Sequence, residues 1–199
     1  TSAQPMTLIS RDANIKSIKD FGPGDKIAVP TVKVSTQAIV LQIAASEAFG
    51  ADQWSKLDAN AVQLCNPDAY AALANSKPEV HNHFSIPPFT FLELKNVPGA
   101  HVVLSSPDVM GGPLSQAQFF TTTKFADANP KIVQAVRDAT KEAQDLIRSD
   151  TKAAVEIYKE VTGDKTSVED LLAWLKEPGM MEWNLQPQGT MKFAAHLFK

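Results

Sequence analysis

Short β-branched runs alternate with amphipathic, helix-like segments through the first half of the chain, and this alternation constrains the fold more than any other feature. KIAVP at 26–30 has the composition of a buried strand and stops at a proline. A helix with one apolar face follows, with Ser35 or Thr36 as its N-cap and Gly50 at its C-terminal end. Residues 26–49 are therefore expected to form a strand-loop-helix unit.

A second unit and two further strands extend the pattern. AVQLC at 61–65 is strand-like, and the following NPD suits the first turn of a helix to about Ala74. EVHNHFSI at 79–86 alternates apolar and polar residues, as in a strand with two unlike faces. PFTFLELKN has the composition of a short helix, and HVVLSS at 101–106 is again β-branched. Strands that alternate with helices indicate a parallel or mixed sheet, with ligand sites at the carboxyl ends of its strands.

The pattern changes after residue 130. QFFTTT at 118–123 is expected to be a last strand, and amphipathic helices then follow from 130, near 150, after 166 and from about 187 to the end. Their apolar stripes need a surface to cover, and the predicted sheet already has helices of its own. We therefore expect either a separate helical bundle or a sheet that this chain does not contain.

Composition and charge exclude some classes of protein. With 19 basic and 22 acidic side chains and no basic cluster, the chain lacks the charge pattern of a nucleic-acid-binding protein. No apolar run approaches the ~20 residues of a membrane-spanning helix, and TSAQPMTLISRD has no signal-peptide pattern. Any export signal is expected to lie outside these residues. Cys65, the single cysteine, excludes an intramolecular disulfide and is expected to be a small buried residue rather than a reactive thiol.

The loop at 31–36 is the first candidate binding site. It joins a strand end to a helix N-terminus, where backbone N–H groups and the hydroxyls of Thr31, Ser35 and Thr36 form a suitable pocket for an anion. Lys33 either adds positive charge or is simply solvated. Plain helix capping is the alternative for the whole loop.

His81 and His83 are the second candidate. Two residues apart in a strand, they project to one face and suggest the start of a zinc site, but only His101 and His196 remain as further histidine ligands. We therefore expect no metal and no cofactor. An exposed polar face and a ligand contact by His83 stay open. Asn66 is likewise either an N-cap or a cleft residue.

Four segments together resemble a known family. KIAVPTVKVSTQAIVLQ, VQLCNPDAYAAL, EVHNHFSIPPF and TTTKFADANPKIVQAVRDATKEAQDLI look like the periplasmic solute-binding components of nitrate/sulfonate/taurine-type ABC importers, which include binding proteins for thiamine-pyrimidine precursors. The resemblance implies an α/β, type II periplasmic-binding-protein-like fold with ligand held between two lobes. One three-layer α/β lobe is expected here, plus a helix-rich C-terminal part of a second lobe.

The resemblance also implies a division of the chain. Residues 1–13 would be a crossover segment, 14–110 the second lobe of the family fold, and 111–199 a mainly helical, incomplete return to the first lobe. GGP at 111–113 would be a hinge or a tight turn. In relatives the strand corresponding to Lys26–Pro30 opens the second lobe, so half of the first lobe is expected to come from a missing segment or a second chain.

Function and site residues follow from the resemblance as expectations. The protein would work in the periplasm, capture a small anionic or heteroaromatic solute, present it to an ABC permease in the inner membrane, and catalyse no reaction. The residues expected to bind ligand are Thr31, Lys33, Ser35, Thr36, Asn66, His83, Ser85 and Pro88. Because half of a lobe is expected to be missing, we predict weak or no solute binding by these residues alone.

The resemblance also allows two other functions, because some proteins similar to this family are enzymes or ligand sensors. A thiamine-pyrimidine synthase-like enzyme would need a cysteine-rich iron motif, and this chain has one cysteine. A ligand-sensing effector domain of a transcription regulator would be attached to a helix-turn-helix segment, and none is visible in the sequence.

Overall fold

The computed structural model describes residues 1–198 of the chain, which fall into two compact units. The helical unit comprises Thr1–Ala3 and Ser115–Pro187. The sheet unit comprises Gln4–Leu114 and the segment that begins at Gln188. The chain therefore passes between the units after Ala3, after Leu114 and after Pro187.

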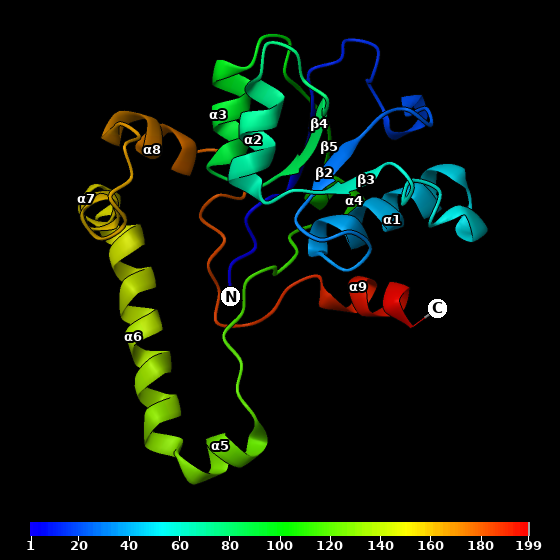
Figure 1. Cartoon of the computed structure of the whole chain (residues 1–199). Helices are drawn as coiled ribbons and strands as arrows, with labels where there is room; N and C mark the ends of the chain where they lie inside the picture. The colour runs from blue at the N-terminus through cyan, green and yellow to red at the C-terminus, as the bar shows by residue number, and fades with distance from the viewer. Residues whose placement is uncertain (199) are drawn as a thin grey trace. The chain divides into compact units, whose positions relative to one another are not determined.

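A five-stranded mixed sheet forms the centre of the sheet unit (Figure 1). Its order is β3 (Ala61–Gln63), β2 (Ile27–Val29), β4 (Asn82–Ser85), β1 (Thr7–Ser10) and β5 (His101–Ser105). β2 is parallel to β3 and β4, whereas β1 is antiparallel to both of its neighbours. All strands except β1 consequently end at the same side of the sheet, which we call the carboxyl edge.

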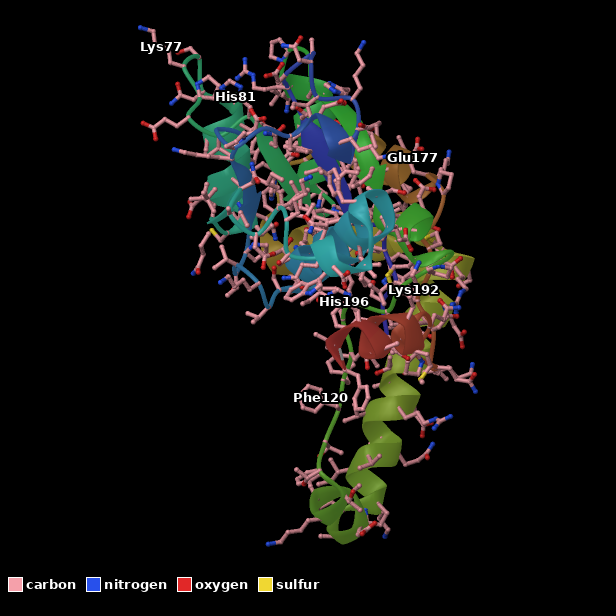
Figure 2. All side chains as sticks on the ribbon, turned by 90° about the vertical axis from the view of Figure 1, so that its right-hand side faces the viewer. Lys77, His81, Phe120, Glu177, Lys192 and His196 are labelled. Atoms are coloured by element: carbon pink, nitrogen blue, oxygen red, sulfur yellow. The ribbon has the colours of Figure 1, made fainter. Side chains whose placement is uncertain are left out.

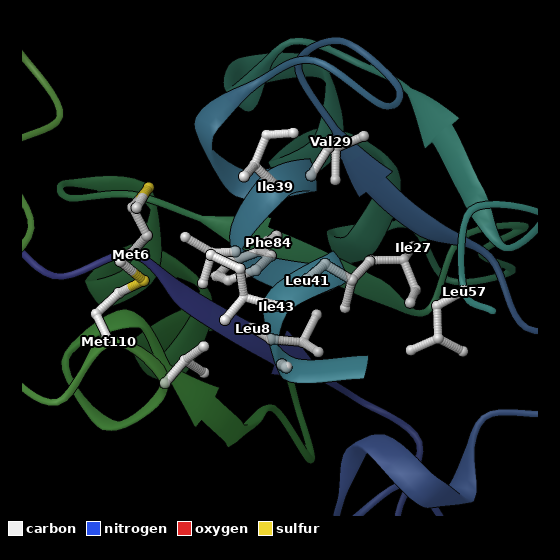
Figure 3. Close-up of a cluster of buried hydrophobic side chains, with 14 of the residues drawn as sticks. Met6, Leu8, Ile27, Val29, Ile39, Leu41, Ile43, Leu57, Phe84 and Met110 are labelled. Carbon is white, nitrogen blue, oxygen red and sulfur yellow. The ribbon is translucent and has the colours of Figure 1, made fainter. Parts of the chain in front are cut away.

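Helices cover both faces of this sheet. α1 (Thr36–Phe49) and α4 (Ser106–Met110) pack on one face, and α2 (Asn66–Ala74) and α3 (Phe89–Asn96) lie together on the other (Figure 1). Successive residues of a strand point to opposite faces. Leu8, Ile27 and Phe84 accordingly join the α1 core (Figure 3), while Ile9 packs with residues of α2 and α3. The result is a three-layer α/β/α arrangement.

α1 is buried nearly all round in its first turns. Nine consecutive residues, Gln37 to Ala45, are buried, so the helix has no solvated face there. The sheet, α4, the short η1 helix (Ile18–Asp20) and α9 (Thr190–Leu197) all contact it. The buried part of this helix is therefore wider than the expected apolar stripe, and it includes the polar residues Gln37 and Gln42.

α9 belongs to the sheet unit rather than to the helices that precede it. Lys192 and His196 project from this helix (Figure 2), and the Lys192 Nζ lies 2.6 Å from a Glu47 carboxylate oxygen of α1. Gly189 precedes α9 with φ of 68°, and a Cβ there would lie 2.5 Å from the Pro113 carbonyl oxygen. Only glycine fits this approach without a shift of the backbone.

Helices make up most of the other unit. They are α5 (Thr123–Ala128), α6 (Pro130–Ser149), α7 (Thr151–Thr162) and α8 (Val168–Leu175), each in contact with the next. Extended chain at Ser2 forms single bridges with Ala117 and Trp183. The exposed apolar residues of α6 and α7 include Ile132, Val133, Val136, Leu146, Ile157, Tyr158 and Val161.

Three expectations about the elements are wrong. Residues 1–13 contain β1, so the sheet begins at Thr7 and not after residue 13. QFFTTT forms no strand, and Phe119 and Phe120 are 82% and 95% exposed in irregular chain (Figure 2). Residues 111–199 do not form one unit, because α9 packs on α1 in the sheet unit. Residue 199 lies outside the described residues.

Candidate functional site

Three helices begin at the carboxyl edge of the sheet. α1 follows β2, α2 follows β3, and α3 follows β4. Because these strands are adjacent and parallel, the three helix N-termini lie along one side of the sheet. Each N-terminus carries partial positive charge, so the edge favours an anion. At the start of α3, the N–H groups of Thr90, Phe91 and Leu92 already donate to backbone carbonyls.

The 31–36 loop lies at this edge. Ser35 is the N-cap of α1, as predicted, and its Oγ accepts a hydrogen bond from the Ala38 N–H at 3.3 Å. The Ser35 N–H in turn donates to the Thr31 carbonyl at 3.2 Å. Thr31 and Lys33 are exposed, and Thr36 is half-buried. The loop therefore holds a capping hydroxyl alongside an exposed hydroxyl and an exposed ammonium group.

Asn66 does not cap α2. Cys65 holds the cap position without a side-chain capping bond to a helix N–H, and Asn66 is already the first helical residue. The Asn66 Oδ1 lies 3.2 Å from the Nε2 of His83 instead. Cys65 is exposed and its Sγ donates to Asp68 at 3.0 Å, so the expectation of a buried thiol is wrong.

His83 is fully buried in the central strand β4. Its Nδ1 lies 2.6 Å from the Oε1 of Glu93, a residue of α3 that is also fully buried. All four residues of β4 are buried because β2 and β1 flank it and helices cover both sides. The predicted strand with one exposed polar face is therefore wrong.

His81 and His83 do not lie together at one site. His81 lies outside β4, and its Nε2 is 3.0 Å from the Pro78 carbonyl. His101 lies beside two backbone carbonyls, those of Gly99 and Ile15. Among residues 1–198, no group of three or more His, Cys, Asp or Glu side chains is placed to hold a metal ion.

Ser85 and Pro88 lie at the end of β4. Ser85 is fully buried, and its Oγ has no hydrogen-bond partner. Pro88 is half-buried at the N-cap position of α3, after a cis peptide bond with Pro87. A ligand on the surface therefore reaches Pro88 directly, whereas contact with Ser85 or His83 requires the covering groups to move.

Glu93 is the functional candidate that the sequence did not indicate. Its signal is a lone carboxylate in the apolar segment FTFLELKN, and such a residue is almost never buried unless it is paired. Its Oε2 and the Oγ1 of Thr90 have no hydrogen-bond partner. Of the expected site residues, His83 and Ser85 are buried, and the others are at least partly exposed: Thr31, Lys33, Ser35, Thr36, Asn66 and Pro88.

No family model and no curated protein matches this chain. Solved structures do match, and two of them follow. The periplasmic aliphatic sulphonate binding protein SsuA from Escherichia coli has a TM-score of 0.63 and 22% identity, covering 87% of this chain. The alkanesulfonate-binding protein SsuA from Xanthomonas axonopodis pv. citri, bound to MOPS, has a TM-score of 0.60 and 21% identity, covering 86%.

These likenesses show the fold. The chain shares the mixed α/β fold of these two structures, with a three-layer sheet unit and a helix-rich unit. It spans 55% of the length of each of the two structures. No helix within residues 1–198 combines the length and the apolar character needed to cross a bilayer.

Proposed function

We propose that the protein is the solute-binding component of an ABC importer and that it captures a small sulfonate-class anion in the periplasm. The observation that carries the proposal is the gathering of three helix N-termini at the carboxyl edge of the sheet. The ligand would bind there, beside Thr31, Lys33, Thr36 and Asn66, with Pro88 as an apolar contact.

The chemistry of the edge suits a small oxyanion. Helix N-termini present N–H donors, and the Thr31 hydroxyl and Lys33 ammonium group are accessible beside them. The net charge is −3, so the attraction has to be local rather than a field of the whole protein. Two structural neighbours named for sulfonate binding favour this class over nitrate and pyrimidine precursors.

The proposed mechanism is binding without chemical conversion. Ligand contacts from two sides would shift an open form toward a closed one, which the permease recognises. The sheet unit supplies one side. Further protein, either another segment of the same protein or a second chain, would supply the other side and cover the exposed apolar faces of α6 and α7.

Equilibrium binding tests this function. Calorimetry with ethanesulfonate, MOPS, taurine and nitrate should give saturable, weak binding that is strongest for the sulfonates. Dimethyl sulfone is a neutral control that keeps the sulfonyl oxygens without the charge, and it should not bind. Equal affinity for the sulfone and the sulfonates would contradict an anion site, and tight binding would show that the cleft is already complete in this chain.

A further inference from the structure

A buried polar chain lies directly beneath the proposed anion site. It consists of Glu93 from α3, His83 from β4 and Asn66 from α2, joined at 2.6 Å and 3.2 Å. The neighbouring strands place Ile9 and Ala28 opposite His83, and both are apolar and buried. The groups that hydrogen-bond to the imidazole are therefore the Glu93 carboxyl group on one side and the Asn66 amide on the other.

The surroundings of the His83–Glu93 pair restrict where its protons lie. Both side chains have no exposed surface, and a buried charge without a partner is strongly destabilising. The pair is therefore neutral overall. The 2.6 Å distance also suits a charge-assisted hydrogen bond.

Two proton arrangements satisfy these restrictions. In one, an imidazolium donates from Nδ1 to the Glu93 carboxylate; in the other, a protonated Glu93 Oε1 donates to Nδ1. In both, the Nε2 of His83 carries a proton. An arrangement with a bare Nε2 needs a protonated Oε2, and Oε2 has no partner to accept that bond.

We propose that the protonated Nε2 of His83 fixes the orientation of the Asn66 amide at the ligand site. The Nε2–H donates to Asn66 Oδ1. The Nδ2 group of the same amide is therefore the donor that faces the carboxyl edge. A reversed amide would present an acceptor oxygen there and repel an anion. Glu93 and His83 are thus positioning residues that set the preference for anions without touching the ligand.

Nitrogen NMR of the ligand-free chain tests the proton position alone. The protein is labelled with ¹⁵N-histidine, and the His83 signals are assigned from a His83→Gln variant. A proton on Nε2 is expected in either form of the pair. A bare Nε2 with a proton on Nδ1 would overturn the inference, whether or not the protein binds sulfonates.

Two variants with the same charge change test whether the Asn66 Nδ2 group donates to the ligand. This test rests on the proposed function. Asn66→Asp replaces the Nδ2 donor by an acceptor, so sulfonate affinity should fall about ten- to a hundredfold. Asn75→Asp makes the same charge change at the exposed C-cap of α2 and should leave affinity nearly unchanged. Equal affinities of the two variants would overturn the donor role, whereas absence of binding by the wild type would contradict the proposed function and leave the NMR result standing.

Discussion

Lys33 combines an unusual backbone with a free cation at the proposed site. Its φ of 67° lies in the left-handed region, which costs a side-chain-bearing residue about 1–2 kcal/mol relative to its usual conformations. Lys33 is exposed, so burial of its side chain does not offset that cost. An observed outlier of this kind at a loop points to a functional reason for the residue.

Replacing Lys33 distinguishes the effect of its charge on binding from the effect of its backbone conformation on stability. Lys33→Gly should leave the free energy of unfolding unchanged or raise it by up to about 1 kcal/mol, because glycine adopts positive φ freely. Sulfonate affinity should fall about two- to fivefold, as expected for loss of one exposed charge. Chemical denaturation and calorimetry measure the two effects.

Lys33→Asn is the matched control, since asparagine tolerates positive φ and carries no charge. It should show the same loss of affinity as the glycine variant. Unchanged affinity in both variants would mean that Lys33 is simply solvated, which is the plainer alternative raised by the sequence.

Sequence reasoning succeeded at residues whose role is local. Ser35 was one of the two residues predicted to cap α1, because a hydroxyl before a helix satisfies a nearby N–H whatever the fold. Asn66 and Glu93 could not be placed, because their main partner, His83, lies on another element. The burial of His83 depends on the position of β4 in the sheet, and no local pattern encodes that position.

The turn between α7 and α8 depends on one carboxylate. The Asp164 Oδ1 accepts a hydrogen bond from the Thr166 N–H at 2.7 Å, and its Oδ2 accepts one from the Tyr158 hydroxyl at 2.9 Å. The Thr166 N–H is the main cause that lowers the pKa of Asp164 below its ordinary value of 3.8, and burial opposes it. The ionised form is therefore the one that stabilises the turn.

Acid should weaken the contribution of Asp164 to stability. Because the folded pKa of Asp164 is lowered, its contribution is fully present above the unfolded value and is lost as pH falls through the folded value. Asp164→Asn should lower the free energy of unfolding at neutral pH by less than about 1 kcal/mol, since the carboxylate is near the surface. The difference should shrink below the unfolded pKa of Asp164; a difference independent of pH in denaturation from neutral to acidic conditions would contradict this.

Two elements were misjudged for opposite reasons. TLIS in β1 is a short run without alternation, and its four residues are all buried because the strand is central and covered on both faces. QFFTTT has strand-like composition but finds no neighbouring strand to pair with, so its phenylalanines stay exposed. In both cases tertiary pairing decided the outcome rather than local propensity.

The two units bury their apolar residues very unequally. The main core cluster lies in the sheet unit, around Met6, Leu41 and Phe84 (Figure 3). In the helical unit, Ile157 and Val161 on α7 are 50% and 79% exposed. Exposed apolar residues gathered on helices are typical of surfaces that another protein element covers.

The exposed face of α7 should therefore bind an apolar fluorescent dye in the native protein. The Ile157→Lys, Val161→Lys double variant should bind less dye, with stability changed by no more than about 1 kcal/mol because both sites are exposed. Glu160→Lys, on exposed surface of the same helix, is the control and should bind dye like the wild type. Equal dye fluorescence from wild type and double variant would show that these faces are not the apolar surface.

The central claim is that backbone amides at the carboxyl edge of the sheet bind a small sulfonate. A titration of the ¹⁵N-labelled chain with ethanesulfonate, followed through backbone amide signals, detects even weak binding at individual residues. Saturable shifts are expected at 31–36, at 65–68 and at the start of α3, with no such shifts from dimethyl sulfone. Saturable shifts confined to other regions, or none at all, would contradict it.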